Sequence, residues 1–149
     1  MRVLIQRVNH AAVTIDGETV GEIGPGMLVF LGVGEGDSEA VADKLIRKVT
    51  GLRIFADENG KTNLDIRQIA GEMLIISQFT LYANCRKGNR PSFTKAGDPE
   101  TAEALYEYFA DRIAGSGIPV ARGVFGGDMK VELENDGPFT IWLDSEDLA

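Results

Sequence analysis

The sequence contains a single cysteine, Cys85, and a single histidine, His10. One cysteine excludes an internal disulfide and fits a reducing compartment. A zinc site needs several convergent His, Cys or carboxylate ligands, so we expect no metal centre. A Ser–His–Asp or Cys–His unit needs a histidine that reaches the nucleophile. His10 ends an expected N-terminal strand, where a structural or surface role is commoner than catalysis, and Cys85 reads as an ordinary loop thiol.

Long apolar runs are also missing from the chain. No segment is apolar enough over its length to cross a bilayer, and residues 1–5 enter a strand pattern directly, without the architecture of a signal peptide. The 149 residues, 44% of them apolar and 26% charged, have the composition of an ordinary globular protein. We therefore expect one domain over residues 1–149, in the cytoplasm, with no membrane partner.

Positive charge is scarce overall, since the formal net charge is −8. This balance argues against nonspecific nucleic-acid binding and against DNA as a partner. Residues 73–97 are a local exception because they contain no Asp or Glu and carry four cations, Arg86, Lys87, Arg90 and Lys95. A second basic group consists of Lys44, Arg47, Lys48 and Arg53. Both groups fit solvated faces, and the first also fits a phosphate-facing patch.

The periodicity of apolar residues gives the order of elements. It predicts strands over residues 2–10, 11–15, 18–23, 27–33, 53–56, 73–76, 120–125, 129–134 and 139–143. It predicts helices over 39–51 and 99–115, capped by Ser38 and Asp98. Residues 63–69 are expected to be irregular, and 135–138 to form a tight turn. This order predicts a mixed α/β domain with its helices packed on one side of the sheet.

The stretch 73–81 has the strongest chemical character. A continuous apolar run, typical of a strand buried on both faces, leads directly into Ser77, Gln78 and Thr80 around Phe79. These side chains either form a site at the strand end or satisfy neighbouring backbone, and the residues alone leave both open. A lone hydroxyl without a base is a weak nucleophile. Backbone N–H groups of Phe79 and Thr80 could instead hold an oxyanion, with the activating group supplied by the substrate.

The second informative stretch is 135–140. Asp136-Gly137 normally signals a hairpin turn, but Pro138 removes a backbone donor and restricts the glycine before it. Only about 5–6% of X–Pro bonds are cis in folded proteins, so the residues alone favour a trans bond here.

Together these stretches resemble the D-aminoacyl-tRNA deacylases. The resemblance rests on residues 77–81 with 135–138, and it extends over essentially the whole chain through 4–8, 21–24, 90–93 and 128–129. Phe139 replaces a smaller residue that is more usual after the Gly-Pro pair. The resemblance implies a layered, barrel-like β-sheet with two main helices packed on one side, a homodimer, tRNA as partner and no cofactor.

The resemblance also implies an activity and a site. The family hydrolyses the ester that joins a D-amino acid, or mischarged glycine, to the terminal adenosine of tRNA and spares L-aminoacyl-tRNA, assisted by the ribose 2′-hydroxyl. The implied reaction side is Ser77, Gln78, Phe79 and Thr80. Substrate binding is implied for Arg7, Phe125, Met129, Gly137 and Pro138, and tRNA binding is expected of Arg86, Lys87, Arg90 and Lys95. Gly137-Pro138, cis by analogy, would enter the partner's pocket and exclude L side chains, with Arg7 holding it.

Two other classes of function remain open. One is a small-molecule ester or amide hydrolase in which Thr80 is the nucleophile. The other is a non-catalytic RNA-binding module.

Overall fold

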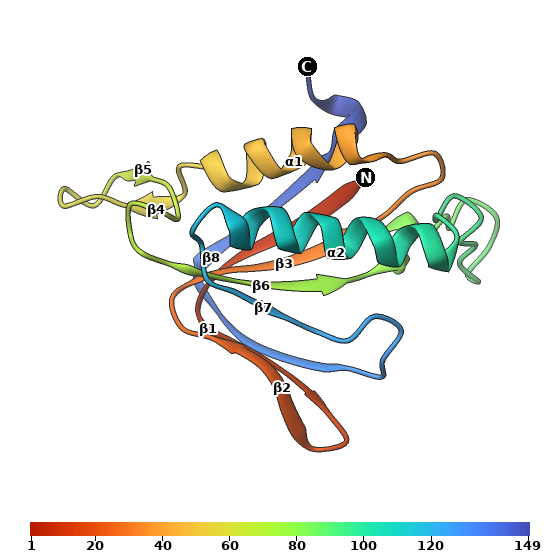
Figure 1. The fold of residues 1–149 in the computed structure, drawn as a ribbon, viewed down its shortest axis with the longest axis horizontal. Coiled ribbons are helices and arrows are strands. Elements are labelled where there is room, and N and C mark those ends of the chain that lie inside the picture. The colour runs from red at the N-terminus through yellow and green to blue at the C-terminus, as the bar shows by residue number, and fades with distance from the viewer.

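The computed structural model describes residues 1–149 as a curved sheet covered on one face by two helices (Figure 1). The strands are β1 Arg2–Ile15, β2 Glu18–Ile23, β3 Gly26–Gly32, β4 Phe55–Ala56, β5 Thr62–Leu64, β6 Glu72–Ser77, β7 Val120–Arg122 and β8 Lys130–Asp144. The helices are α1 Glu39–Gly51 and α2 Pro99–Gly115, with short 3-10 turns η1 Phe79–Tyr82 and η2 Ser145–Asp147. No helix combines the length and apolar character needed to cross a membrane.

The main sheet has six strands in the order β2-β1-β3-β6-β7, with β8 on β1. β1 runs antiparallel to β2, β3 and β8, whereas β3, β6 and β7 are parallel to one another. The sheet curls until β2 lies against β7, where a Cβ on Gly21 would sit 2.5 Å from the Arg122 carbonyl oxygen. This near closure confirms the barrel-like sheet with two helices on one side.

The sheet has a core on each face, which explains the continuous apolar pattern of β6. Met73 and Ile75 face the helices, where they belong to the same core as the apolar stripe of α2. Leu74 and Ile76 point into the curl of the sheet, where they meet Val13 of β1 and other apolar side chains. These four consecutive residues of β6 are all buried, as the sequence predicts for a strand covered on both faces.

Local signals place the helix starts and the first hairpin as expected. The Ser38 side chain accepts from the Val41 N–H, and the Asp98 side chain accepts from the Thr101 N–H. Asp16 and Gly17 both have positive φ, 50° and 81°, as a two-residue turn between β1 and β2 requires.

Several sequence-based boundaries are wrong. Residues 2–10 and 11–15 form one continuous strand, β1, and the strand expected over 53–56 is confined to Phe55–Ala56. Thr62–Leu64 is not irregular, because it pairs with β4 in a small separate sheet. The strand expected over 120–125 ends at Arg122, because the residues after it leave the sheet and line a pocket.

The expected turn at 135–138 is instead a bulge within β8. Val8 pairs with Asn135 and Gln6 with Thr140, so Arg7 alone faces residues 136–139. Asn135 closes the bulge, because its amide donates to the carbonyls of Arg7 and Phe139 and accepts from the Phe139 N–H. Both halves of β8 can therefore pair with the same strand, and no reversal of the chain is needed.

No peptide bond in the structure is cis. The cis Gly137-Pro138 bond implied by the resemblance is therefore wrong, and the trans bond favoured by the residues alone is found. Trans is the isomer of lower free energy for an X–Pro bond, by roughly 0.5–1 kcal/mol. Gly137 accommodates the bulge with φ 119°, a conformation that L side chains rarely adopt.

Candidate functional site

A pocket of about 670 Å³ lies at the carboxyl end of β6. Ser77, Gln78 and Phe79 line it, together with Phe125 and Met129 from the segment between β7 and β8. The start of α2 and the loop before it contribute Phe93, Ala96, Gly97, Pro99 and Ala102. The remaining lining residues are Val33, Ile76, Gly126, Gly127, Asp128 and Val131. The carboxyl ends of parallel strands are where open α/β sheets commonly bind ligands, so the topology favours a site here.

Aromatic side chains shape the mouth and wall of this pocket. The Phe79 and Phe93 rings meet edge to face with centroids 5.0 Å apart, although Phe79 stays 56% exposed. Behind the pocket, Tyr106 of α2 lies against Phe125 at 6.3 Å between ring centroids. The exposed Phe79 ring offers an apolar surface to a ligand entering from solvent.

Tyr106 also fixes the strand that leads into the site. Its buried hydroxyl donates to the Ile75 carbonyl at 2.6 Å, two residues before Ser77. Burial raises the pKa of Tyr106 to about 12, with a smaller contribution from Glu107. The hydroxyl therefore remains a donor at physiological pH, and α2 is tied to the strand end.

The turn η1 presents free backbone donors next to the pocket. Gln78 N–H donates to the Leu31 carbonyl, and Leu81 N–H donates to the Gln78 carbonyl. The N–H groups of Phe79 and Thr80 donate to no group of the chain, and no side chain caps the turn. Two adjacent unpaired donors can stabilise a developing oxyanion.

Thr80 is exposed and does not line the pocket. Its hydroxyl oxygen instead accepts a short hydrogen bond from the Gln78 side-chain amide. A neutral amide cannot remove the hydroxyl proton. No carboxylate or imidazole hydrogen-bonds to this hydroxyl, so the arrangement offers no activation of Thr80 as a nucleophile.

Histidine chemistry is absent from the pocket. His10 is exposed, and its Nε2 lies 4.0 Å from Oε2 of Glu134. It lines a different cleft, together with Glu22 and Glu72. The chain has no cluster of three or more His, Cys, Asp or Glu that could hold a metal ion. Cys85 is an exposed loop thiol.

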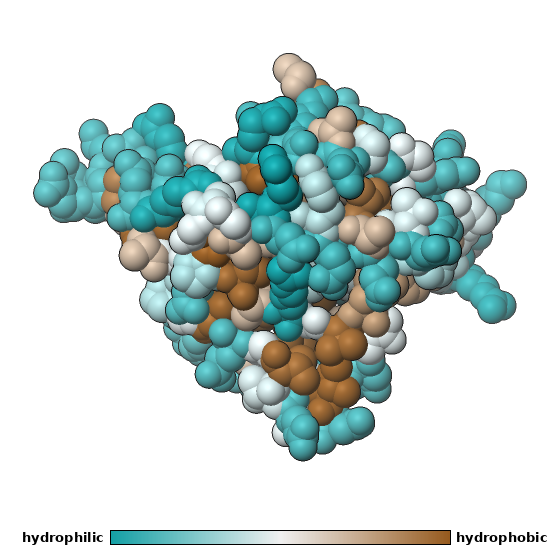
Figure 2. Space-filling model, in the orientation of Figure 1, coloured by the Kyte–Doolittle hydropathy of each residue, from teal (hydrophilic) through white to brown (hydrophobic).

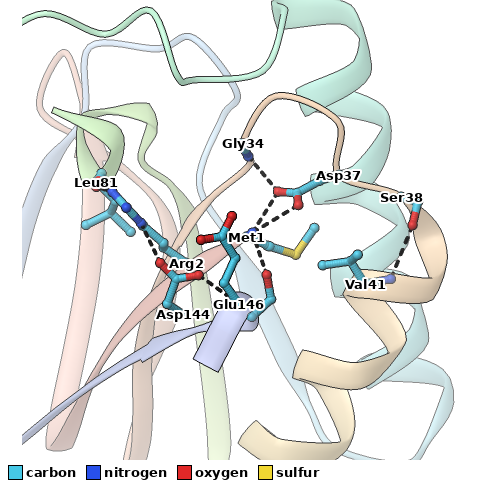
Figure 3. Close-up of polar contacts among 10 residues, drawn as sticks. Met1, Arg2, Gly34, Asp37, Ser38, Val41, Leu81, Asp144 and Glu146 are labelled. Carbon is cyan, nitrogen blue, oxygen red and sulfur yellow. Dashed lines mark hydrogen bonds and ion pairs between the residues drawn. The ribbon is translucent and has the colours of Figure 1, made fainter. Parts of the chain in front are cut away.

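Arg2 holds the far end of η1 in place (Figure 3). Its Nη1 donates to the Leu81 carbonyl at 2.9 Å, and its Nε pairs with the Asp144 carboxylate at 2.9 Å. The guanidinium also lies 4.4 Å from the centroid of the Tyr82 ring. Strand β1 and the end of β8 thereby position the turn that carries Phe79 and Thr80.

A second cluster surrounds the β8 bulge and is distinct from the pocket lining. Arg7 donates to the Asp136 carbonyl at 3.1 Å and to the Ile54 carbonyl at 2.6 Å, and it lies 4.7 Å from the Phe139 ring centroid. A Cβ on Gly137 would come 2.3 Å from Arg7 Nη2. Gly137 and Pro138 themselves are exposed.

The predicted tRNA-binding cations divide between two neighbouring clefts. Arg86, Lys87 and Arg90 line a shallow cleft of about 600 Å³ whose lining has no acidic side chain. Lys95 instead lines an adjoining cleft of about 640 Å³, which Arg86 shares and which also contains acidic side chains.

The structure thus brings Ser77, Gln78 and Phe79 together with Phe125 and Met129, and it leaves Thr80 outside the lining. Arg7, Gly137 and Pro138 gather elsewhere on the same chain. Sequence reasoning assigned no role to Phe93, Asp128 or Asn135. All three fall in motifs that carry the resemblance, which was the available signal.

The fold and pocket define a class: a mixed α/β chain with a ligand-sized pocket at the end of a central strand. A family model described as D-Tyr-tRNA(Tyr) deacylase matches residues 4–144. The chain belongs to this family.

Individual relatives agree with the family. A protein of Aeromonas hydrophila named D-aminoacyl-tRNA deacylase is 58% identical, covering 96% of this chain and 99% of its own. One of Ruegeria pomeroyi with the same name is 56% identical over 97% and 99%. A solved structure titled c-Myc DNA Unwinding Element Binding Protein has a TM-score of 0.92 at 38% identity, covering 97% of this chain and 98% of its own. A probable eukaryotic D-amino acid tRNA deacylase, 19% identical, shares the fold with a TM-score of 0.82, covering 95% and 97%.

Proposed function

We propose that this chain binds the aminoacylated 3′ end of tRNA in the β6 pocket and releases the D-amino acid there. As a member of its family the chain is a D-aminoacyl-tRNA deacylase, a hydrolase of ester bonds. The observation that carries the proposal is the pair of unpaired N–H groups on Phe79 and Thr80, beside a pocket that has no histidine and whose one lining carboxylate is Asp128. We expect the activity in the cytoplasm, where aminoacylated tRNA is used in translation.

Hydrolysis requires water to attack the ester carbonyl, with the 3′-oxygen of the ribose as leaving group. The carbonyl oxygen gains negative charge in the transition state, and the N–H groups of Phe79 and Thr80 stabilise it there. Removing one such donor typically costs about 10²–10³ in rate. Ser77 and Gln78 lie beside these donors and orient the ester.

The 2′-hydroxyl of the terminal ribose assists the reaction. This chain offers no imidazole near the pocket, and the Thr80 hydroxyl is bonded to a neutral amide. The vicinal hydroxyl of the substrate lies next to the reacting ester and can orient the attacking water and pass a proton to the leaving 3′-oxygen. Thr80 then positions Gln78 and does not attack.

Chirality is selected by the β8 bulge of a second subunit. Gly137 and Pro138 are exposed, and Arg7 and Asn135 hold the bulge in one shape. A rigid backbone segment placed at the α-carbon of the substrate leaves no room for an L side chain. Glycine has no side chain to exclude, so mischarged glycyl-tRNA is hydrolysed too.

A homodimer fits the exposed features of β8. This strand pairs only with β1, so its outer edge is open along much of its length. Long open edges are usually covered in native assemblies. Trp142 on the same strand is 48% exposed.

The tRNA-binding patch consists of Arg86, Lys87, Arg90 and Lys95 on the loop beside the pocket. Their side chains make no ion pair with Asp or Glu of the chain, so their charge is available to phosphates. A protein that reads only the acceptor end of tRNA needs such a local patch and not a basic surface, which reconciles the activity with a net charge of −8.

Hydrolysis of D-Tyr-tRNA by Thr80→Ala tests this chemistry. We expect the variant to retain substantial deacylation. Complete loss of turnover with retained tRNA binding would instead identify Thr80 as the nucleophile. Hydrolysis of a simple D-tyrosine alkyl ester, which lacks the 2′-hydroxyl, would contradict substrate assistance.

A further inference from the structure

We propose that the exposed side of α1 forms a second tRNA-binding surface, which contacts the phosphate backbone. Lys44, Arg47, Lys48 and Arg53 line a groove of about 460 Å³ there. Its other lining residues are Gly51, Leu52, Leu148 and Ala149, so no Asp or Glu side chain takes part. The one negative group of the lining is the terminal carboxylate of Ala149, which makes no ion pair with the cations. We call this set of residues the α1 groove. The inference extends the proposed function, because it assigns the same substrate a second contact.

The cations of the α1 groove have no acidic partners. No ion pair of the structure involves any of the four. Five other arginines and lysines of the chain do pair with carboxylates, including Arg112 and Arg122. The Arg53 guanidinium donates to the backbone carbonyl and side-chain oxygens of Asn63, so Lys44, Arg47 and Lys48 are the groove cations without a partner. In a chain with a net charge of −8, these three cations around one groove form a local excess of positive charge.

The α1 carboxylate that is spaced to pair with a groove cation along the helix, Asp43, is directed elsewhere. Asp43 lies four residues before Arg47, the spacing at which opposite charges pair along a helix. Its carboxylate instead accepts from the Tyr108 hydroxyl at 2.8 Å and pairs with Arg112 at 3.7 Å, both on α2. The acidic side of α1 is thus used in packing the two helices, and the basic side faces solvent.

The spacing of the lysines costs stability. Lys44 and Lys48 are four residues apart, and like charges at this spacing destabilise a helix by about 0.2–0.5 kcal/mol. Lys48 also lies in the last turn, where the helix dipole favours a cation, but Lys44 lies too far from that end for the same benefit. A polyanionic ligand would offset the repulsion.

The α1 groove is linked to the β8 bulge through hydrogen bonds of Arg7. Arg53 precedes Ile54, whose carbonyl accepts from Arg7, and Arg7 also donates to the Asp136 carbonyl. In the proposed dimer this bulge enters the partner's pocket, and the groove residue Arg53 is the chain neighbour of the residue that anchors Arg7 beside the bulge. Figure 2 shows a mostly hydrophilic surface over α1 at the top of the view, as expected of a helix face exposed to solvent.

The test uses Lys44→Gln/Lys48→Gln in the full chain, with Lys61→Gln/Arg67→Gln as a control of equal charge change outside the groove. Binding of tRNA that carries no amino acid is measured between 50 and 200 mM salt. Each lost phosphate contact lowers the slope of log K against log salt by about 0.9. The unmodified protein should therefore lose roughly tenfold more affinity over this range than the groove variant. The control should match the unmodified protein.

Two further readings separate folding and chemistry from RNA contact. The groove variant should keep its melting temperature or raise it slightly, because a like-charge pair has been removed. It should hydrolyse D-tyrosyl-adenosine, which has no phosphate, at the unmodified rate while hydrolysing D-Tyr-tRNA less efficiently at 150 mM salt. Equal salt slopes for groove variant and control would overturn the proposal. Failure of the unmodified protein to hydrolyse D-Tyr-tRNA would overturn the proposed function, and the binding arm would still test the groove.

Discussion

Arg2 Nη1 donates to the carbonyl oxygen of Leu81 at 2.9 Å and so connects the first strand to the last part of the turn at the pocket. The same guanidinium pairs with Asp144 and lies over the Tyr82 ring. These contacts hold Leu81 and Tyr82, the last two residues of η1. A residue at the start of the chain therefore positions the proposed oxyanion donors without touching the substrate.

Replacing Arg2 by Lys should lower kcat more than it raises KM. Lysine keeps the charge but lacks the fork that bonds the carboxylate and the carbonyl together. We expect kcat on D-Tyr-tRNA to fall between about tenfold and 100-fold, because small misplacements of reacting groups have costs of this size. Steady-state kinetics on D-Tyr-tRNA give both constants.

Arg112→Lys is the matched control for Arg2. Arg112 also pairs with a carboxylate, Asp43, and also lies near an aromatic ring, Tyr108, at 5.7 Å from its centroid. It contacts no residue of the pocket through these interactions, so its replacement should leave kcat within about twofold. Equal losses in the two variants would show that Arg2 has no positioning role.

Asp144 should make the free energy of unfolding depend on pH in the acidic range. Burial raises the pKa of Asp144, but the hydrogen bond from the Glu146 N–H and the pairing with Arg2 outweigh it, so the pKa lies below its ordinary value. A lowered pKa in the folded state adds stability that is fully present above the pKa of the unfolded chain, about 3.9. This stability is lost as pH falls from there through the folded-state pKa.

Asp144→Asn should consequently be less stable than the unmodified protein at pH 7, and the difference should shrink below about pH 4. Urea unfolding at several pH values measures it. A difference in the free energy of unfolding that stays constant from pH 7 to pH 3 would show that the carboxylate charge of Asp144 is not the cause.

Gly137→Ala should disturb the bulge more than its backbone conformation alone explains. The new Cβ would lie 2.3 Å from Arg7 Nη2, so the guanidinium must move away from Asp136. Gly60→Ala is the control, since Gly60 has φ 76° and a Cβ there meets nothing within 4 Å. Both variants place an alanine at positive φ, which costs on the order of 1–3 kcal/mol, with the larger cost expected at Gly137 because its φ of 119° lies further from the left-handed helical region. Only Gly137→Ala should also raise the rate of hydrolysis of L-Tyr-tRNA relative to D-Tyr-tRNA. If the ratio of the two rates is the same in Gly137→Ala and Gly60→Ala, the bulge does not select chirality.

Arg86→Gln/Arg90→Gln should weaken tRNA binding and flatten its salt dependence, because both cations line one cleft without acidic neighbours. The slope of log K against log salt should fall by about 1.8. Lys95→Gln should have a smaller effect, since Lys95 lies in the adjoining cleft beside acidic residues. Filter binding over a salt series measures both, and unchanged slopes would remove these residues from the tRNA-binding surface.

The sequence predicts those parts of the fold that local chemistry determines. Ser38 and Asp98 cap the helices as expected, and the run from Met73 to Ile76 is buried on both faces. Ser77, Gln78 and Phe79 could be placed at the end of that strand because a polar cluster follows an apolar run. Each of these signals lies within a few residues of the feature it predicts.

The features that the sequence did not predict depend on contacts between distant segments. The bulge at 136–139 requires β1 as the common partner of both halves of β8, and an Asp-Gly-Pro sequence taken alone favours a turn. The anchoring of Leu81 by Arg2 spans 79 residues. Thr80 belongs to the polar cluster in sequence, yet the short turn η1 directs it away from the pocket.

The most direct test of the whole account compares deacylation of D-Tyr-tRNA and L-Tyr-tRNA by the unmodified protein under identical conditions. We predict rapid loss of the D ester, with the L ester lost no faster than in buffer. Equal cleavage of both would support the oxyanion chemistry of Phe79 and Thr80 and contradict the role given to Gly137 and Pro138. Cleavage of neither would contradict the proposed function itself.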